Sequence, residues 1–283
     1  MSCLFPVGTY KLDGSQTYRP CGSCIQCRLG YAYDWAIRCV HEAQLHEENS
    51  FLTLTYNNNN LPLDGSVHKT EMQKFMKRLR RKIEPVKVRF FGCGEYGEKL
   101  GRPHYHLCLF GYDFPDKQIH YARKRGKRHT DLLYVSEMLS EIWKKGFTTI
   151  GEVNIQTAGY VARYVTKKIT GKKAPKHYQK KNPEFALMSR MPGIGASWLD
   201  KYETDVYPKD YHVINGRKVR PPRYYDSLLE KKKPELMKVI KEKRKEKIDV
   251  DAARVCDNEK RLKEKYRICV TRRLERNLEN GKN

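Results

Sequence analysis

Two strand-like runs on either side of a short glycine-containing turn constrain the fold more than any other feature of this sequence. The run "VKVRFFGCGEYG" (86–97) is followed by "EKLGR" (98–102) and then by "HYHLCLFG" (104–111). Runs rich in aromatic and β-branched residues favour strands, and a short connection containing glycine joins two such strands as a hairpin. We therefore expect an antiparallel hairpin within the central sheet of the molecule.

Strand-like and helix-like segments alternate around this hairpin. Strand patterns recur at "SFLTLTY" (50–56) and "FTTIGEVN" (147–154). Helices are expected from Arg28 to about His46, over 70–83, over 132–146 with Gly146 as the C-cap, and over 157–169. This interleaved order predicts an α+β fold, in which a central, largely antiparallel sheet carries helices on one face.

The composition divides the chain into four segments. A cysteine-rich N-terminal module with its helix (1–49) precedes a central domain (50–172). An arm punctuated by proline and glycine (173–225) follows, and then a basic, highly charged tail (226–283). Apolar residues recur every four positions in this tail, as in a helix: Leu262, Tyr266, Val270, Leu274 and Leu278. A solvated helix or a disordered arm is about as plausible for the tail as a clamp on nucleic acid.

The charge of the chain indicates a polyanionic partner. Its 57 Lys and Arg residues exceed its 33 Asp and Glu residues, which gives a formal net charge of +24. The 19 tyrosines favour nucleic acid, since aromatic rings stack on unpaired bases. An anionic membrane surface and a merely soluble basic protein are the weaker alternatives.

The sequence also indicates a reducing, membrane-free location. The segment "MSCLFPVGTYKLDG" (1–14) lacks the basic and apolar regions of a signal peptide, and no apolar run approaches membrane length. We therefore expect a cytosolic protein with no membrane partner. Its nine cysteines are then more plausible as thiols or metal ligands than as disulfides.

Three of these cysteines stand close together. Cys21, Cys24 and Cys27 are spaced C-x2-C-x2-C, and Cys3 could complete a set of four ligands. Such a set suits structural zinc in a reducing cell. The triplet also resembles part of an iron–sulfur run, although the next ligand and its proline are missing. The alternative without a metal is three free thiols near the start of a helix.

The second strand of the hairpin carries two histidines on one face. His104 and His106 project together because alternate residues of a strand share a face, and Leu107 then faces the opposite way. A hairpin that closes over 97–103 brings Glu95 beside them, with Glu98 as a reserve ligand. Two imidazoles and one carboxylate suit a divalent ion that acts as a Lewis acid on a phosphate oxygen. Alternatively, the two histidines are exposed or bind nucleic acid without specificity.

A helix further along the chain carries two tyrosines in register. Tyr160 and Tyr164 are four residues apart and share a helix face, which Lys167 and Lys168 continue. A tyrosine hydroxyl can attack a phosphodiester and form a covalent intermediate, and a nearby lysine can stabilise the charge on the phosphate. The alternative is that both tyrosines are amphipathic residues at the margin of the core.

These motifs together resemble a known family. A His-x-His strand followed by a tyrosine helix is similar to the pattern of HUH endonucleases. The resemblance extends over about residues 1–230 to the replication initiation proteins of gokushovirus-type microviruses, which are small single-stranded DNA phages. It rests on "PCGSCIQCR", "DWAIR", "FLTLTY", "GEYGEKLGRPHYHLCLFG", "GYVARYVTKK", "PGIGASWL" and "RPPRYYD". The middle position of the His-x-His motif is usually aliphatic in the family, whereas here it is Tyr105.

The resemblance implies a fold, a set of roles and a reaction. It implies an HUH/RRM-like catalytic domain at 50–172. It makes His104 and His106 ligands of Mg²⁺ or Mn²⁺, and less firmly Glu95. It makes Tyr160 and Tyr164 the paired nucleophiles and places Lys167 or Lys168 at the position of the helix lysine.

The implied reaction is the initiation of rolling-circle replication in the cytoplasm of a bacterial host. One tyrosine nicks a single-stranded origin and keeps the 5′-phosphate, and the second tyrosine allows the strand to be rejoined as a circle. The chain lacks a G-x-x-x-x-G-K-[ST] loop, so a host helicase and polymerase would unwind and copy the DNA. A plasmid initiator, relaxase or transposase with the same chemistry, or a non-enzymatic protein that binds single-stranded DNA, are the competing hypotheses.

Overall fold

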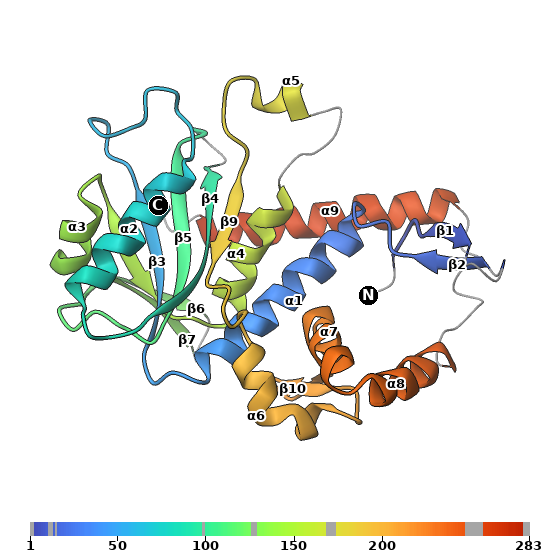
Figure 1. Cartoon of the computed structure of the whole chain (residues 1–283). Coiled ribbons are helices and arrows are strands. Elements are labelled where there is room, and N and C mark those ends of the chain that lie inside the picture. Colours follow the sequence, from blue (N-terminus) through green and yellow to red (C-terminus); the bar gives the residue numbers. More distant parts are fainter. Residues whose placement is uncertain are drawn as a thin grey trace. The chain divides into compact units, whose positions relative to one another are not determined.

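The described strands of residues 35–203 form one sheet, in which every neighbouring pair is antiparallel (Figure 1). The order across the sheet is β6-β7-β8-β3-β5-β4-β9. The strands are β3 (Asn49–Thr55), β4 (Arg89–Tyr96), β5 (Pro103–Phe110), β6 (Gln118–Arg125), β7 (His129–Val135), β8 (Thr148–Gly151) and β9 (Phe185–Met188). The α+β class and the antiparallel sheet predicted from the sequence are confirmed.

The computed structural model describes residues 3–10, 14, 16–97, 100–125, 129–167, 174–246 and 257–279. The chain divides into two compact units. One consists of Met1–Asp34 together with Thr204–Asn283, and the other of Trp35–Glu203. The sheet belongs to the second unit.

The hairpin of β4 and β5 forms as the sequence predicts. Glu95 pairs with His104, and Cys93 pairs with His106. The turn closes through the Gly97 amide, which donates to the Arg102 carbonyl at 3.0 Å. Gly97 has no side chain, and a Cβ atom there would lie only 3.2 Å from Cε1 of His104. The turn therefore leaves room for the first histidine ring.

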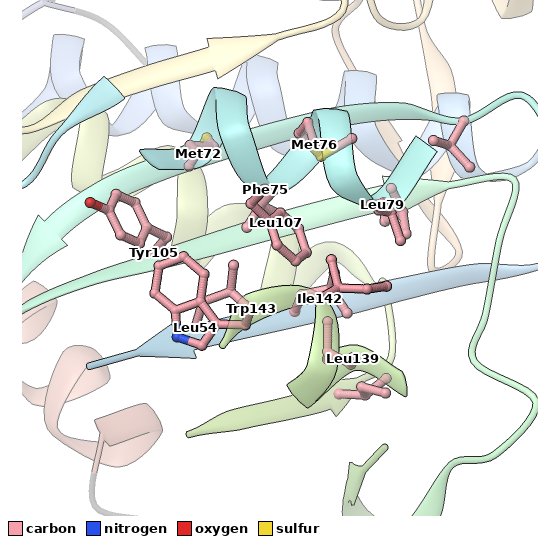
Figure 2. Close-up of a cluster of buried hydrophobic side chains, with 14 of the residues drawn as sticks. Leu54, Met72, Phe75, Met76, Leu79, Tyr105, Leu107, Leu139, Ile142 and Trp143 are labelled. Atoms are coloured by element: carbon pink, nitrogen blue, oxygen red, sulfur yellow. The ribbon is translucent and has the colours of Figure 1, made fainter. Parts of the chain in front are cut away.

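One face of the sheet is covered by α2 (Lys69–Lys82) and α3 (Glu137–Trp143). Figure 2 shows their apolar side chains packed on those of β3 and β5. The central members of this cluster are Leu54, Met72, Phe75, Met76, Leu79, Tyr105, Leu107, Leu139, Ile142 and Trp143. The buried hydroxyls of Tyr56 and Tyr105 lie 3.0 Å apart, and the hydroxyl of Tyr105 accepts from the His68 amide at 3.1 Å. Burial of this apolar surface is the main stabilising contribution of the face.

The opposite face, which carries the two histidines, is packed against two further helices, α1 (Ile25–Ala43) and α4 (Ile155–Lys167). The ring of Trp35 on α1 stacks on Phe91 of β4, with centroids 4.6 Å apart. A Cβ atom on Gly159 of α4 would lie 3.8 Å from the Cβ atom of Ala36, so the two helices approach closely there. The sequence led us to expect helices on one face. The second face is also packed because its Phe91, Cys93 and Cys108 are apolar and fully buried.

The segment 132–146 differs from the single helix expected for it. Its first residues complete β7, which pairs with β6 and β8. The helix α3 begins only after Ser136, whose hydroxyl accepts from the Leu139 amide at 3.0 Å. Its C-cap is Lys144, in the left-handed conformation at φ 59°, and Gly146 lies beyond it at φ 153°. A strand ladder on both sides thus overrides the helical propensity of "LLYV".

The segment 173–225, expected as an arm, contributes regular elements to the fold. It contains α5 (Ala174–Tyr178), the edge strand β9, α6 (Ala196–Val206) and a short hairpin of β10 (His212–Ile214) and β11 (Arg217–Val219). β9 pairs with β4 over Phe185–Met188. The sheet is therefore completed by residues that follow the tyrosine helix in the sequence.

The other unit combines the two ends of the chain. It contains the hairpin of β1 (Val7–Tyr10) and β2 (Gln16–Arg19), α7 (Arg223–Lys232), α8 (Pro234–Glu246) and α9 (Asp257–Glu279). Arg244 joins two carboxylates, since its Nε donates to Asp210 at 2.8 Å and its Nη1 to Asp226 at 2.7 Å. On α9, Leu262 and Tyr266 are exposed, and the side chains of Leu274 and Leu278 lie outside the described residues.

Within the described part of the chain, no helix has both the length and the apolar character that a membrane span needs.

Candidate active site

The β4–β5 hairpin gathers two imidazoles and one carboxylate. The Nε2 atom of His104 lies 2.8 Å from Oε1 of Glu95, and the Nε2 atom of His106 lies 2.9 Å from the same oxygen. The strand register produces this arrangement, because Glu95 is directly opposite His104 and diagonal to His106. The structure thus brings together the three residues that the sequence suggested as metal ligands.

The far side of each imidazole is held by a neighbour in the sheet. The Nδ1 atom of His104 is 3.0 Å from the Arg102 carbonyl, and the Nδ1 atom of His106 is 3.0 Å from the hydroxyl of Thr53 on β3. These contacts fix both rings with Nε2 directed at Glu95. Phe51 stacks on His106 at a centroid distance of 5.7 Å, which limits rotation of that ring.

The chemistry of this cluster calls for a positive charge at its centre. A carbonyl only accepts hydrogen bonds, so Nδ1 of His104 must carry a proton and donate it to Arg102. In a neutral ring the Nε2 atom then presents a lone pair, and it faces a carboxylate oxygen at 2.8 Å. Either a second proton on the ring or a cation between the two atoms relieves this repulsion.

The second oxygen of Glu95 supports the same conclusion. The Glu95 side chain is fully buried, and among the described residues its Oε2 atom has no hydrogen-bond partner. A buried carboxylate oxygen is costly unless it is paired or coordinates a metal. All three candidate ligand atoms lie within 4.8 Å of one another. The residues present therefore fit a divalent cation.

Tyr160 of α4 lies against the histidine pair. Its ring meets that of His106 at a centroid distance of 5.0 Å and an angle of 90°. It also meets the ring of Phe51 edge-on at 6.5 Å. The side chain of Tyr160 is only 7% exposed. The helix predicted for the two tyrosines thus packs on the same face of the sheet as the histidines.

The other predicted members of the site are only partly described. The backbones of Tyr164 and Lys167 belong to α4, while their side chains lie outside the described residues. Lys168 and the reserve ligand Glu98 lie outside them altogether. Their roles remain predictions from the sequence.

Comparisons with known proteins identify the family. A family model for replication-associated proteins of the ORF2 type matches residues 49–169. The replication-associated protein VP4 of Bdellovibrio phage phiMH2K is 34% identical over 227 residues, which cover 76% of this chain and 69% of that protein. The chain belongs to the family of phage replication-associated proteins. The resemblance seen in the sequence motifs is therefore confirmed.

Two further phage replication-associated proteins extend this comparison. The replication-associated protein ORF2 of Spiroplasma virus 4 is 32% identical over 239 residues, covering 80% of this chain and 72% of that protein. For the replication-associated protein ORF4 of Chlamydia phage 1 the identity is 33% over 240 residues, which cover 80% of this chain but 58% of that protein. No solved structure matches the chain significantly.

The region that matches the replication-associated family model contains the whole of this candidate site. Residues 49–169 include the hairpin with Glu95, His104 and His106 and both helix tyrosines. Cys3, Cys21, Cys24 and Cys27 lie outside the matched region and in the other compact unit. The protein therefore has two separate groups of candidate metal ligands among its described residues.

Sequence reasoning did not assign roles to the residues that orient the histidines. Thr53 and Arg102 act through contacts that depend on strand register and on the shape of the turn. The alternation of "FLTLTY" gives one available signal, because it places Thr53 on the same sheet face as Phe51. Which residue of the neighbouring strand it meets follows only from the pairing of β3 with β5.

Proposed function

We propose that this protein initiates rolling-circle DNA replication by nicking a single-stranded origin through a tyrosine. The observation that carries the proposal is the edge-on packing of Tyr160 against His106, within the group formed with Glu95 and His104. A nucleophile-bearing helix and a set of metal ligands thereby meet at one place on the sheet. Membership of the phage replication-associated family supports the same function.

In this proposal Glu95, His104 and His106 hold a divalent cation, Mg²⁺ or Mn²⁺. When bound, the cation would withdraw charge from an oxygen of the scissile phosphate and so favour attack on phosphorus. The protein's own contribution is to keep both Nε2 atoms directed at Glu95. The contacts from Arg102 and Thr53 supply this orientation.

The nucleophile is a phenolic oxygen. It forms a bond to phosphorus while the bond between phosphorus and the 3′ oxygen breaks, so the 5′-phosphate becomes linked to the tyrosine. The phenolic proton leaves the tyrosine, and the released 3′ oxygen takes up a proton to become the hydroxyl that primes synthesis. Lys167 or Lys168 would stabilise the charge on the phosphate and assist this proton transfer.

The two tyrosines divide the work. They are one turn of α4 apart, about 6 Å of rise, so both can serve one phosphate site after a small shift. One tyrosine holds the 5′ end while the other cuts after a full round, and the free 3′-hydroxyl then attacks the first phosphotyrosine to close the circle. Because Tyr160 is buried, we propose that Tyr164 forms the first link.

The proposed partners follow from this chemistry and from the charge of +24. The substrate is a single-stranded replication origin, which basic side chains bind through its phosphates. Each transesterification replaces one phosphodiester by another, so rejoining needs no nucleotide cofactor. Unwinding and synthesis are assigned to the host helicase and polymerase.

A covalent adduct on a denaturing gel tests the proposal directly. Single-stranded oligonucleotides tiled over the genome that encodes the protein are labelled at the 3′ end, because the downstream fragment would stay on the tyrosine. With Mg²⁺ or Mn²⁺, one oligonucleotide is expected to shift to the mass of the protein. The same oligonucleotide labelled at the 5′ end should yield a shorter free fragment and no labelled adduct.

Variants assign the residues. We expect adducts from Tyr160→Phe and from Tyr164→Phe, none from the double variant, and none from His104→Ala/His106→Ala. The matched control is Tyr121→Phe, on the edge strand β6, which should behave like the unchanged protein. Peptide mapping of the adduct to Tyr105 or Tyr178 would sink the helix assignment. A protein that binds the oligonucleotides but never forms an adduct would be a non-enzymatic binder.

A further inference from the structure

Four cysteines from two separate segments converge at the start of α1. Cys3 precedes the β1–β2 hairpin, Cys21 follows it, and Cys24 and Cys27 flank the first residues of the helix. Their sulfur atoms all lie within 4.8 Å of one another. Cys24 is buried, and the other three are half-buried. The proposed nicking reaction uses none of them.

The sulfur–sulfur spacing identifies the kind of bond that this group can form. Sγ of Cys3 lies 3.9 Å from Sγ of Cys24. A disulfide requires about 2.05 Å, so this pair is not oxidised. Four thiolates placed about 2.3 Å from a tetrahedral zinc ion lie about 3.8 Å from one another. The Cys3–Cys24 distance therefore agrees with the edge of a zinc–thiolate tetrahedron.

The backbone around the group donates hydrogen bonds to sulfur. The Cys21 amide donates to Sγ of Cys3 at 3.2 Å, and the Cys24 amide donates to Sγ of Cys21 at 3.3 Å. The hydroxyl of Ser23 also donates to Sγ of Cys21, at 3.6 Å. Donors directed at sulfur favour the thiolate form, which is the form that binds a metal. The loop of residues 21–24 is thus shaped to present sulfur ligands.

We infer that Cys3, Cys21, Cys24 and Cys27 form a structural zinc site, which anchors the β1–β2 hairpin to the start of α1. Four protein ligands fill a tetrahedral shell and leave no open position for a substrate, as in structural rather than catalytic sites. The β1–β2 hairpin has only four residue pairs, and an isolated two-stranded hairpin is marginally stable at best. Cys3 and Cys21 bracket the hairpin, so one ion fixes both of its ends.

Metal analysis of the full chain tests the site, provided that the histidine cluster cannot contribute. We therefore place every variant in the His104→Ala/His106→Ala background. That protein is expected to contain about one zinc per chain after dialysis. Adding Cys24→Ser should remove the zinc, whereas the matched control Cys269→Ser, an exposed cysteine on α9, should retain it. A stoichiometric amount of iron with visible absorption would overturn the zinc assignment in favour of an iron–sulfur cluster.

A second measurement keeps the inference testable if Cys24→Ser does not fold. Cobalt supplied to the chelator-treated His104→Ala/His106→Ala protein should give the intense visible absorption of a tetrahedral thiolate site. Hydrogen exchange then tests the anchoring role. After chelation, the amides of β1 and β2 should exchange at least about ten-fold faster, while those of β4 and β5 remain unchanged.

Two results would overturn the inference. One is a protein without zinc or iron whose four thiols are alkylated freely in the native state. The other is a hairpin whose exchange does not respond to chelation, which would remove the anchoring role even if zinc binds. Neither result bears on the nicking reaction, whose proposed residues are Glu95, His104, His106 and the helix tyrosines.

Discussion

At the scale of single residues, Thr53 determines how His106 presents its ring. The hydroxyl of Thr53 lies 3.0 Å from Nδ1 of His106. With that nitrogen engaged, Nε2 is left facing Glu95. Residues that orient a metal ligand in this way commonly change metal affinity when they are replaced, without themselves touching the metal. Thr53 is therefore a positioning residue for the proposed centre.

We predict that Thr53→Val weakens cation binding. Valine keeps the shape of threonine but cannot hydrogen-bond to His106. The Mg²⁺ or Mn²⁺ concentration for half-maximal adduct formation should rise by about ten- to one hundred-fold, with a yield near the original at saturating cation. The shift of the thermal unfolding midpoint with added cation should require higher concentrations in the same proportion.

Two variants separate orientation from simple loss of stability. Thr53→Ser keeps the hydroxyl and should restore the original titration. Thr149→Val changes the residue opposite Thr53 on β8, one strand further from His106, and should leave the titration unchanged. Identical cation titrations for Thr53→Val and the unchanged protein would contradict the positioning role.

The residue scale also shows what the sequence could reveal about the site. His104 and His106 were predictable because a two-residue spacing places side chains on one strand face. Glu95 was predictable because the glycine-containing turn indicated a hairpin. The contacts of Arg102 and Thr53 were not, since the first uses a backbone carbonyl and the second depends on which strand lies beside β5.

At the scale of elements, the connection from α3 to β8 is governed by Gly146. This residue adopts φ 153°, and a Cβ atom on it would lie 2.4 Å from both the Thr55 carbonyl oxygen and the Asn57 amide nitrogen. The chain therefore passes directly against the end of β3. The Asn57 amide donates to the Lys145 carbonyl at 3.0 Å, and the Thr55 amide donates to the Phe147 carbonyl at 2.9 Å.

We predict that Gly146→Ala destabilises the unit formed by residues 35–203. Alanine is strained at this φ and collides with backbone atoms, which cannot move aside as a flexible side chain can. The loss should be about 3 kcal/mol, measured as a lower urea midpoint in equilibrium unfolding. Gly65→Ala is the control, because Gly65 has φ 60° but a Cβ atom there meets only the end of Lys181 at 3.8 Å. Its cost should be about 1–2 kcal/mol, and equal losses in both variants would refute the steric argument.

Elements also differ in how well their sequence predicts them. The alternation in β3 and the helical stripe of α2 each agree with the structure, because local pattern and tertiary packing favour the same conformation. The residues "LLYV" (132–135) were expected in a helix but form part of β7. Their apolar pattern fits either conformation, and pairing with β6 and β8 decides between them. The strand β9 was missed because four residues carry little periodic signal.

At the scale of the whole molecule, the net charge of +24 should dominate binding to single-stranded DNA. A protein that neutralises about five phosphates releases their counterions, so its affinity falls by roughly 100-fold between 50 and 200 mM salt. We predict a fall of this size for the Tyr160→Phe/Tyr164→Phe protein, which binds without forming a covalent link. Fluorescence anisotropy of a labelled oligonucleotide measures it.

Binding and catalysis should separate in this measurement. The His104→Ala/His106→Ala variant is expected to keep the same salt dependence, because these histidines are not the source of the positive charge. Affinity that barely changes with salt would mean that the excess of lysine and arginine does not contact the DNA backbone.

The two edges of the sheet have a consequence for the behaviour of the protein at high concentration. An open strand edge can pair with another chain and lead to aggregation. Here β9 offers only four residues at one edge. At the other edge, the pairing of β6 with β7 is interrupted by a register shift between Ile119 and Tyr121. A short strand and an irregular one are both poor templates, so the sheet is protected from growing into intermolecular assemblies while the protein accumulates.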